Sequence, residues 1–431
     1  MKLNLLKDKR ILILGLGKEG ESSFRFLRKQ FPDKRIGLAD ELILNKLSFT
    51  IQKLIKKDRK TKLHLGKSYL LSVKDYDIII KTPGISKKLF LPYLAKQKIT
   101  SQTEIFLEKY KKQTIGVTGT KGKGTTANLI YKIFKDNGVK TELVGNIGKP
   151  VLDYWIDKPT KKIFIFELSS HQLENLKISP HIAVFLNIYS DHLNYFKNFK
   201  KYFEAKANIA KWQTKTDYFI FNKNFQKIKN LAEKSLAKKI AFGSKKTSDY
   251  FVCNVLAAEI VSSLFKISNK KTKKSIKNFE GFEHRLEFVG KFKGINFYND
   301  SAATIPEATM AALNSLKNVG TIILGGSEKK SEFNLLAKII IKKGIKNIIL
   351  FPKEGKRIWQ EISKETKKNQ PEHFFVNNMK EATKLCFQYT KRGQTCLLSP
   401  ACASFSTFDD YQDRGKQFKK YVKNLAKNEK R

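Results

Sequence analysis

The chain has 431 residues, too many for one ordinary hydrophobic core, and its 85 Lys and Arg outweigh 39 Asp and Glu to give a net charge of +46. The length predicts two or three domains, and no apolar run reaches the roughly 18 residues that a membrane-spanning helix needs. The lysines are scattered through all regions, so we interpret the charge as a diffuse basic surface that attracts anionic nucleotides. A nucleic-acid-binding protein is the alternative class that this charge suggests.

The N-terminal sequence MKLNLLKDKRILIL is basic and then apolar, like a weak secretory signal. Its apolar run is too short for a signal peptide and leads directly into GLGKEG, so a buried first strand is the better interpretation. The four cysteines, Cys253, Cys386, Cys396 and Cys402, form no CxxC pair and no zinc spacing. We expect reduced thiols and a cytoplasmic protein.

Short apolar runs that end in Gly, Ser, Asp or Thr alternate along the chain with amphipathic, lysine-rich stretches of helical length. This alternation predicts an α/β fold built on parallel sheets, with ligands at the carboxyl ends of the strands. The sequence marks the domain boundaries less sharply than the strands, and we expect domains over residues 1–109, 110–283 and 284–431. The predicted strands lie in residues 10–17, 76–84, 114–120, 162–170, 182–192, 217–222, 320–326, 346–351 and 395–401.

The first predicted strand leads into Gly15-Leu-Gly17-Lys-Glu-Gly20, and Asp40 follows 20 residues after Gly20. This spacing fits a dinucleotide-binding turn at a helix N-terminus. The motif alone is short, and it does not distinguish NAD from a uridine nucleotide.

The strongest motif is GVTGTKGKGTT, residues 116–126, between a predicted strand and the helix ANLIYKIFKDNG. A glycine-rich turn at a helix N-terminus presents backbone N–H groups and the positive end of the helix dipole to phosphate oxygens. Lys123 is placed to lie along the β and γ phosphates. The pattern departs from the strict GxxxxGK[ST] loop, because Gly124 stands where the Mg²⁺-binding hydroxyl is expected and Thr125 follows it.

Acidic and imidazole side chains follow two further strands of the central region. Glu167 ends the run IFIF, and Asp191-His192 follows IAVFLNIYS. An acid at a strand end beside a phosphate loop is suited to hold Mg²⁺ during phosphoryl transfer. Each segment alone is also compatible with a solvated helix start or a structural histidine.

The last region carries three polar strand ends. Asn299-Asp300-Ser301 follows KGINFY, Gly325-Gly326 follows TIIL, and residues 399–404, SPACAS, follow TCLL. Cys402 has no histidine nearby in sequence, so a buried thiol is a better interpretation than a nucleophile.

Taken in order, these segments resemble the Mur ligase family, and within it the branch that adds glutamate. GVTGTKGKGTT resembles the family's ATP loop, and VGNIGKP, ELSSHQLE and NIYSDHLNYF resemble its central-domain signatures in order and spacing. FEHRLE resembles the hinge into the last domain. LLSPACASFSTFDDYQDRGKQF is similar to the end of the glutamate-adding branch, and the resemblance covers nearly the whole chain.

The resemblance implies a Rossmann-like N-terminal domain that binds a UDP-linked precursor, a P-loop-type central ATPase domain and a Rossmann-like C-terminal domain that binds the amino acid. It implies a cytoplasmic monomer of peptidoglycan synthesis that uses ATP and Mg²⁺ to join D-glutamate to UDP-N-acetylmuramoyl-L-alanine. The chemistry implied is phosphorylation of the alanyl carboxylate to an acyl phosphate, which the glutamate amine attacks.

Individual roles follow from matching positions. The catalytic residues implied are Lys123, Glu167, His192 and Lys206, and the metal ligands Thr125, Glu167, His192 and a carbamylated Lys206. The implied ATP contacts are Gly119, Thr120, Lys121, Gly122, Lys123, Gly124, Thr125, Thr126, Asn254, Arg285 and Asp300. The implied precursor contacts are Gly15, Gly17, Lys18, Glu19, Asp40, Thr82, Pro83, Gly84 and Asn146, and the amino-acid contacts Lys329, Ser404 and Tyr411.

Four departures from the family pattern bear on this assignment. Gly124 replaces a hydroxyl residue, Ala302 replaces a lysine, Ser327 replaces an acid, and residues 222–253 form a shortened segment. They leave an inactive descendant as one alternative. Others are a ligase that uses L-glutamate or another amino acid, and a folylpolyglutamate synthetase, although that family lacks the precursor-binding first domain and the SPACAS ending.

Overall fold

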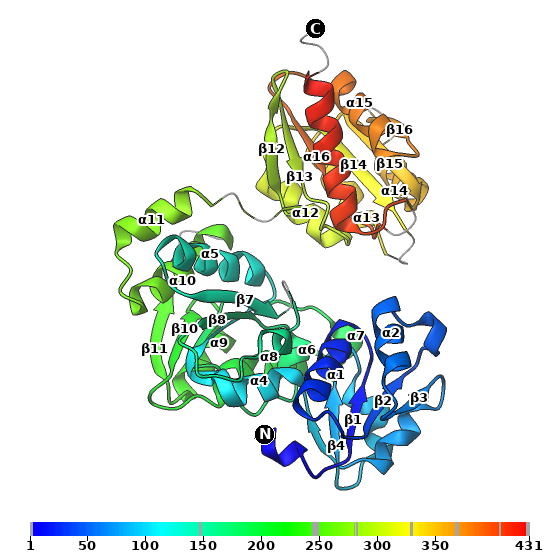
Figure 1. The fold of residues 1–431 in the computed structure, drawn as a ribbon. Coiled ribbons are helices and arrows are strands. Elements are labelled where there is room, and N and C mark those ends of the chain that lie inside the picture. The colour runs from blue at the N-terminus through cyan, green and yellow to red at the C-terminus, as the bar shows by residue number, and fades with distance from the viewer. Residues whose placement is uncertain are drawn as a thin grey trace. The chain divides into compact units, whose positions relative to one another are not determined.

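The computed structural model describes residues 3–145, 149–243, 250–279, 281, 283–327, 331–366, 370–404 and 407–427. The chain divides into two compact units, Met1–Phe279 and Glu280–Arg431. Figure 1 shows their elements along the chain, and each unit is described by itself below. Within the described ranges, no helix is long and apolar enough to cross a membrane.

The first unit contains two parallel sheets. The N-terminal sheet has the order β3-β2-β1-β4-β5, so β1 lies at its centre between β2 and β4. Its strands are β1 (Ile11–Leu14), β2 (Ile36–Asp40), β3 (Thr61–Leu65), β4 (Ile78–Lys81) and β5 (Lys98–Thr100), and its main helices are α1 (Lys18–Gln30) and α2 (Phe49–Lys57).

The second sheet of this unit has the order β11-β10-β9-β6-β8-β7, with β6 flanked by β9 and β8. The strand order reverses at β6, and such a switch point is where open α/β sheets bind ligands. The strands are β6 (Thr114–Thr118), β7 (Thr141–Gly145), β8 (Ile163–Glu167), β9 (Ile182–Phe185), β10 (Tyr218–Asn222) and β11 (Lys238–Phe242). The helices that bear on the site are α5 (Lys123–Asp136), α6 (Ser170–Leu173), α8 (Phe199–Lys211) and α10 (Tyr250–Leu264).

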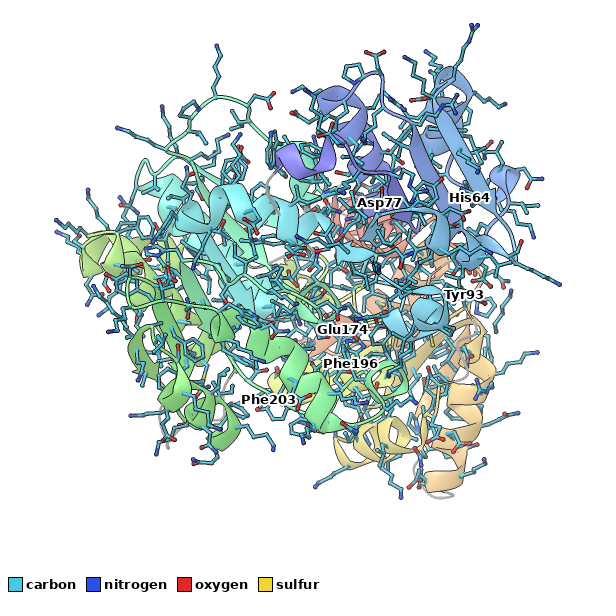
Figure 2. The ribbon with its side chains drawn as sticks, turned by 90° about the horizontal axis from the view of Figure 1, so that it is seen from below. His64, Asp77, Tyr93, Glu174, Phe196 and Phe203 are labelled. Carbon is cyan, nitrogen blue, oxygen red and sulfur yellow. The ribbon has the colours of Figure 1, made fainter. Side chains whose placement is uncertain are left out.

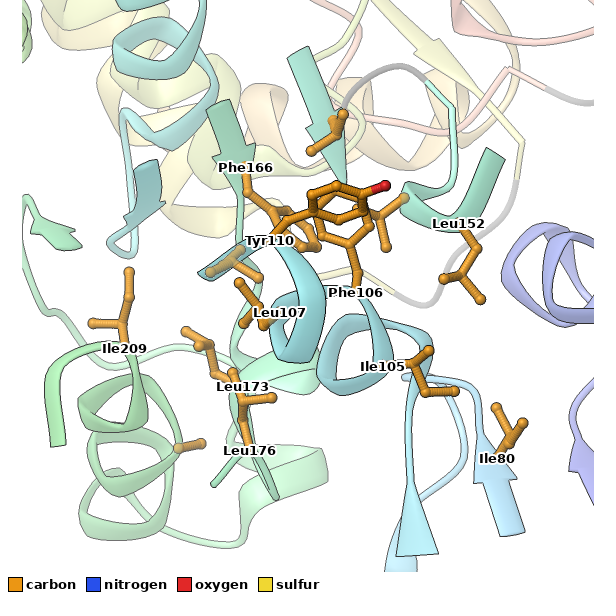
Figure 3. Packing of buried hydrophobic residues seen from close by; sticks show 14 of the residues in the cluster. Ile80, Ile105, Phe106, Leu107, Tyr110, Leu152, Phe166, Leu173, Leu176 and Ile209 are labelled. Carbon is orange, nitrogen blue, oxygen red and sulfur yellow. The ribbon is translucent and has the colours of Figure 1, made fainter. Parts of the chain in front are cut away.

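One buried hydrophobic cluster runs through both sheets of the first unit. Helix α4 (Gln102–Tyr110) supplies Ile105, Phe106 and Leu107, which belong to the same cluster as Ile80 of the N-terminal sheet and Phe166 of the central sheet. Figure 3 shows these side chains around α4. Because protein cores are close-packed and resist deformation, this cluster makes the two sheets one mechanical body.

The second unit has one sheet in the order β12-β13-β17-β14-β15-β16. Its strands are β12 (Glu287–Phe292), β13 (Ile295–Asn299), β14 (Val319–Gly326), β15 (Asn347–Lys353), β16 (Glu372–Phe375) and β17 (Thr395–Leu398). Helices α12 (Pro306–Ser315), α13 (Asn334–Lys342), α14 (Glu354–Glu365), α15 (Met379–Tyr389) and α16 (Tyr411–Lys427) accompany it.

The predicted α/β class is confirmed, and every predicted run contains a strand. The expectation of wholly parallel sheets is wrong at one place, because β12 pairs with β13 in the antiparallel sense. The strands that the sequence did not reveal are β2 and the edge strands β3, β5, β7, β11, β12 and β16. Edge strands tolerate charged residues and need no continuous apolar run, and TKLHL and KKIAF carry lysines for that reason.

Candidate active site

The loop after β6 forms a phosphate-binding turn at the start of α5. Gly122 is the N-cap of α5 and has a φ of 80°, a conformation that glycine adopts without strain. A Cβ on Gly122 would lie 2.4 Å from Oδ1 of Asn254, so glycine is also required by close packing. This contact brings Asn254 of α10 to the loop, as its predicted role in ATP binding requires.

Neighbouring strand ends hold the loop in place. The backbone N–H of Lys121 donates to Oδ1 of Asn187 at 2.9 Å, and Nδ2 of Asn187 donates to the carbonyl oxygen of Lys121 at 2.9 Å. The backbone N–H of Tyr189 donates to Oγ1 of Thr120 at 2.9 Å. The loop is therefore fixed from the segment after β9 and needs little reorganisation to receive a ligand. Asn187 and Tyr189 were not singled out from the sequence.

Two lysines converge on one carbonyl oxygen at the head of this loop. Nζ of Lys123 donates to the carbonyl oxygen of Gly119 at 3.0 Å, and Nζ of Lys206 donates to the same oxygen at 2.8 Å. Lys206 comes from α8 and is only 1% exposed. Burial, followed by the charge of Lys123, lowers the pKa of Lys206 well below its ordinary value, against the opposing charges of Asp191 and Glu167. This environment therefore disfavours the charged form of Lys206 relative to an exposed lysine.

Glu167 ends β8 and His192 lies in the segment that follows β9, the two strands that flank β6. Glu167 ends β8, pairs with Val117 in the parallel register and is 4% exposed. His192 has a φ of 52°, which is uncommon outside glycine, and its side chain is about half exposed. The structure thus brings Lys123, Glu167 and Lys206 to the carboxyl edge of the central sheet, with His192 beside them.

The hydroxyl groups near Gly124 differ in exposure. Thr125 is half-buried, whereas Thr126 is fully buried. Thr125 therefore remains the accessible hydroxyl beside Lys123. Among the described residues no group of three or more His, Cys, Asp or Glu side chains is arranged to hold a metal. A Thr125 hydroxyl with the Glu167 carboxylate fits Mg²⁺ that arrives with nucleotide, since Mg²⁺ commonly takes one or two protein oxygens together with phosphate oxygens.

His171 is a second imidazole at this edge that the sequence did not single out. Its ring centroid lies 5.0 Å from that of His192 and 4.4 Å from that of Tyr195. Burial, followed by the charges of His192, Lys81 and Lys206, lowers the pKa of His171 to about 4. Tyr195 in turn donates its hydroxyl to Oε2 of Glu174 at 2.9 Å. Figure 2 labels Glu174 and the neighbouring Phe196 on the green part of the ribbon. His171 and Glu174 belong to the ELSSHQLE segment, residues 167–174, and Tyr195 and His192 come from the NIYSDHLNYF segment.

The loop after β1 forms the second candidate nucleotide site of the first unit. Gly15 has a φ of 94°, and a Cβ there would lie 2.1 Å from Oγ1 of Thr82, which brings the β4 turn against the loop. Gly17, Lys18 and Gly84 are exposed, and Pro83 is half-buried. These positions leave backbone groups of both turns accessible, as the predicted precursor site requires.

Two acids close to this loop, Asp40 at the end of β2 and Glu19 at the start of α1, bind other parts of the protein. Asp40 accepts the backbone N–H of Leu16 at 2.7 Å through Oδ2 and that of Leu42 at 2.8 Å through Oδ1. Glu19 accepts Nε2 of Gln172 at 2.8 Å. Both oxygens of Asp40 are engaged in this way, which favours shaping of the loop over direct contact with a ligand. Oε1 of Glu19 is engaged as well, while its Oε2 is buried without a hydrogen-bond partner among the described residues.

In the second unit, Asp300 lies at the carboxyl end of β13 and is 8% exposed. It accepts the hydroxyl of Ser399 at 2.7 Å and the backbone N–H of Leu286 at 3.1 Å. Burial raises the pKa of Asp300 to about 7, against the lowering effects of these hydrogen bonds and of Arg285. Arg285 itself is exposed. The strand ends of β13 and β17 therefore meet at Asp300, as the sequence predicts.

A fully buried arginine organises the loops beside Asp300. Arg414 donates to the hydroxyl and the carbonyl oxygen of Ser301 at 2.9 and 2.8 Å and to the carbonyl oxygen of Cys402 at 3.1 Å. It holds the turns that carry Ser404, which is 3% exposed, and Tyr411, which is 37% exposed. The sequence reasoning missed Arg414, although an arginine inside YQDRGKQF is the visible signal. Among the predicted contacts, Asn146 and Lys329 lie outside the described residues.

Comparisons with known proteins agree with this geometry. Residues 117–306 match the Mur ligase middle domain, and residues 284–402 match the Mur ligase glutamate ligase domain. The chain is 31% identical to the UDP-N-acetylmuramoylalanine–D-glutamate ligase of Natranaerobius thermophilus, over 96% of this chain and 98% of the relative. It is 30% identical to the protein of that name from Caldanaerobacter subterraneus subsp. tengcongensis, over 98% of this chain and 100% of the relative.

Solved structures show the same fold at lower identity. The UDP-N-acetylmuramate–alanine ligase of Thermotoga maritima superimposes with a TM-score of 0.59 at 16% identity, over 97% of this chain and 100% of that chain. The MurF ligase of the same organism, solved with ADP, gives a TM-score of 0.58 at 14% identity and covers 100% of both chains. These likenesses confirm the three-domain fold. By its sequence relationship to the D-glutamate ligases over nearly its full length, the chain belongs to the Mur ligase family and is a ligase.

Proposed function

We propose that this chain joins D-glutamate to UDP-N-acetylmuramoyl-L-alanine at the expense of ATP, in the cytoplasm and as a monomer. The convergence of Lys123 and Lys206 on the carbonyl oxygen of Gly119, at the head of α5, carries the proposal. The relatives named as D-glutamate ligases support the choice of amino acid. In this proposal residues 1–109 bind the precursor, 110–283 bind ATP and 284–431 bind the amino acid.

The reaction proposed begins with transfer of the γ-phosphoryl group to the alanyl carboxylate. The oxygen of that carboxylate forms the new bond to phosphorus, ADP leaves, and an acyl phosphate results. The glutamate amine then attacks the acyl carbon, the tetrahedral intermediate loses inorganic phosphate, and the amine loses its proton. The protein's task is to position reactants and to neutralise charge.

The residues of the β6 edge have distinct parts in this proposal. Lys123 swings from the Gly119 carbonyl to the β and γ phosphates, and the backbone N–H groups of residues 119–122 face the phosphates at the α5 N-terminus. Thr125 and Glu167 hold Mg²⁺, which neutralises the phosphate charge when bound. Asn254 remains against Gly122 at the nucleotide.

Lys206 fits a carbamylated lysine. Carbamylation requires the neutral amine, and burial together with the charge of Lys123 shifts the pKa of Lys206 in the direction of that form. The amine nitrogen bonds to the carbon of CO₂ and releases a proton, which turns a buried cation into a carboxylate-like group. That group would join His192 as a second set of metal ligands.

The second unit supplies the remaining predicted contacts. Arg285 and Asp300 contact the nucleotide, and Ser404, Tyr411 and Lys329 hold the two carboxylates of glutamate. The departure at Ala302 removes one cation from this region, while Arg414 keeps a buried positive charge beside Ser301.

The experiment that tests the function is ADP release from MgATP with UDP-N-acetylmuramoyl-L-alanine and, separately, D-glutamate, L-glutamate, lysine or no amino acid. The proposal expects release that requires D-glutamate. Release with L-glutamate alone would keep the chemistry and change the substrate. Binding of the precursor without ADP release in any mixture would identify a ligase-like protein that has lost its activity. The same assay with folate in place of the precursor tests the folylpolyglutamate synthetase alternative.

A further inference from the structure

A partly buried polar contact links the two candidate nucleotide sites of the first unit. Nε2 of Gln172 donates to Oε1 of Glu19 at 2.8 Å, across 153 positions of sequence. Glu19 is the second residue of α1 and belongs to the loop after β1. Gln172 is the third residue of α6, which begins directly after Glu167 and Leu168 at the end of β8.

Both polar atoms of the Gln172 side-chain amide are hydrogen-bonded, Nε2 to Glu19 and Oε1 to the backbone of Ser169. Its Oε1 accepts the backbone N–H of Ser169 at 3.0 Å, and its own backbone N–H donates to Oγ of Ser169 at 3.2 Å. This reciprocal pair is a capping box, which fixes the first turn of a helix. A displacement of Glu19 is therefore passed to Ser169, two residues from Glu167.

Glu19 also lies near the turn that follows β4, residues 82–84. Burial raises the pKa of Glu19, and the neighbouring Gln172, Gln102 and Lys81 oppose that rise. Nζ of Lys81 donates to the carbonyl oxygens of Thr82 and Ile85 at 3.1 and 2.7 Å. Lys81 thus holds the turn of residues 82–84 by hydrogen bonds, and its charge acts on the Glu19 carboxylate that bonds Gln172.

A small cavity confirms that the two segments are neighbours. Pro83 of the β4 turn and His171 and Gln172 of α6 line it together, with Lys81. The packed core around α4 joins the two sheets into one body, so a local shift at Glu19 cannot be absorbed by separation of the sheets.

We infer that Glu19 and Gln172 are positioning residues that couple occupancy of the precursor loop to the geometry of the ATP site. The inference rests on the proposed function, because it takes residues 15–20 as the loop that meets the UDP precursor. In this view Glu19 does not contact the diphosphate. Its carboxylate acts through Gln172, and precursor binding to the loop tightens the strand end that carries Glu167.

The test uses the full-length protein and measures the dissociation constant of UDP-N-acetylmuramoyl-L-alanine with and without a non-hydrolysable ATP analogue and Mg²⁺. The ratio of the two constants is the coupling factor. Coupling between sites is typically about 5- to 150-fold, and we expect the wild-type factor to lie in this range.

Two variants test the pair itself. Gln172→Glu keeps an acceptor for the capping box but places two carboxylates together, and we expect it to reduce the coupling factor to about 1. Combining it with Glu19→Gln restores an amide–carboxylate hydrogen bond with the donor and acceptor exchanged. We expect the combined variant to regain at least half of the wild-type coupling on a logarithmic scale.

Lys29→Ala is the matched control. Lys29 lies at the far end of α1 and pairs with Asp157 at 3.3 Å in an exposed contact of the same helix. We expect its coupling factor to equal that of the wild type. Equal thermal midpoints for all variants would show that the loss of coupling is not a loss of folding.

The inference is overturned if Gln172→Glu keeps wild-type coupling, if the combined variant recovers none, or if Lys29→Ala loses coupling as well. Wild-type protein that fails to bind the precursor would overturn both the inference and the proposed function. Binding and coupling without D-glutamate-dependent ADP release would remove only the proposed function, because the coupling factor needs no turnover.

Discussion

Replacement of Arg414 by Met should destabilise the second unit by about 3 kcal/mol. Arg414 is fully buried and makes three hydrogen bonds of 2.8 to 3.1 Å, besides a longer one of 3.4 Å to the carbonyl oxygen of Ala403. Among the described residues it forms no ion pair with a carboxylate. Hydrogen bonds of charged groups contribute about 1.5–3 kcal/mol each, and their loss leaves buried acceptors unpaired. Three such bonds therefore contribute roughly 6 kcal/mol.

The desolvation of the guanidinium offsets part of this contribution. Burial lowers the pKa of Arg414 to about 10 from an ordinary 12.5. At about 1.4 kcal/mol per tenfold change in proton affinity, the buried charge opposes folding by roughly 3 kcal/mol. Met fills most of the volume without that cost, so the net loss is the difference, about 3 kcal/mol.

Urea unfolding followed by Trp359 fluorescence measures this change. Trp359 is the single tryptophan of the second unit, since the other two are Trp155 and Trp212, and its ring stacks on His373 at 3.7 Å. With Trp155 and Trp212 replaced by Phe, the signal reports the second unit alone, which avoids a two-state treatment of the whole chain. At a slope of about 2 kcal/mol per M, the midpoint should fall by roughly 1.5 M.

Arg392→Met provides the control, because Arg392 is exposed and makes one long hydrogen bond of 3.4 Å to the carbonyl oxygen of Lys293. We expect it to change the unfolding midpoint by less than about 0.3 M. Since Arg414 supports the turns of Ser404 and Tyr411, Arg414→Met should also raise the KM for D-glutamate more than that for ATP. A midpoint within 0.3 M (about 0.5 kcal/mol) of the wild type would refute the assignment of three strong bonds.

Three further outcomes are expected. Lys123→Ala should abolish ADP release while the affinity for the UDP precursor stays within about twofold, and retained turnover would contradict the role of Lys123. Lys206→Ala should inactivate the enzyme, with partial recovery of ADP release on addition of short carboxylic acids; inactivation without recovery leaves carbamylation unsupported. Burial acts to raise the pKa of Asp217, but hydrogen bonds from His181, Lys111 and the Thr214 backbone outweigh it, so the folded pKa is lowered. Asp217 should therefore stabilise the fold above its unfolded pKa of about 3.9 and lose that contribution as the pH falls further; urea midpoints measured from pH 6 to pH 3 should decline less steeply for Asp217→Asn than for the wild type.

The sequence predicts the central candidate site because the signals for it are local. Lys123 and Glu167 each sit within a strand, turn and helix start that is contiguous in sequence, and strand ends of one parallel sheet meet at one edge. The glycine pattern around Gly122 also has a local cause, a positive φ at the helix start. These features predict which residues gather without knowledge of the remaining chain.

The residues that the sequence missed depend on distant partners. Arg414 binds Ser301 across 113 positions and becomes important only when β13, β17 and α16 are packed together. His171 faces His192 because α6 follows one strand and the His192 segment follows another. A histidine or arginine in the middle of a motif carries no sign of such a partner.

The direction of a side chain is the hardest property to predict from a motif, and Glu19 and Asp40 show why. Glu19 follows β1 and Asp40 ends β2, and the spacing of these two segments predicts nucleotide binding. Both carboxylate oxygens of Asp40 accept hydrogen bonds from backbone N–H groups, while Oε1 of Glu19 accepts one from Gln172. An anionic side chain aimed at a diphosphate would repel it, so an acid in a phosphate loop is tolerated when the protein supplies its own donors. We therefore propose that these two acids shape the loop, and that ligand contacts come from the exposed backbone of Gly17, Lys18 and Gly84.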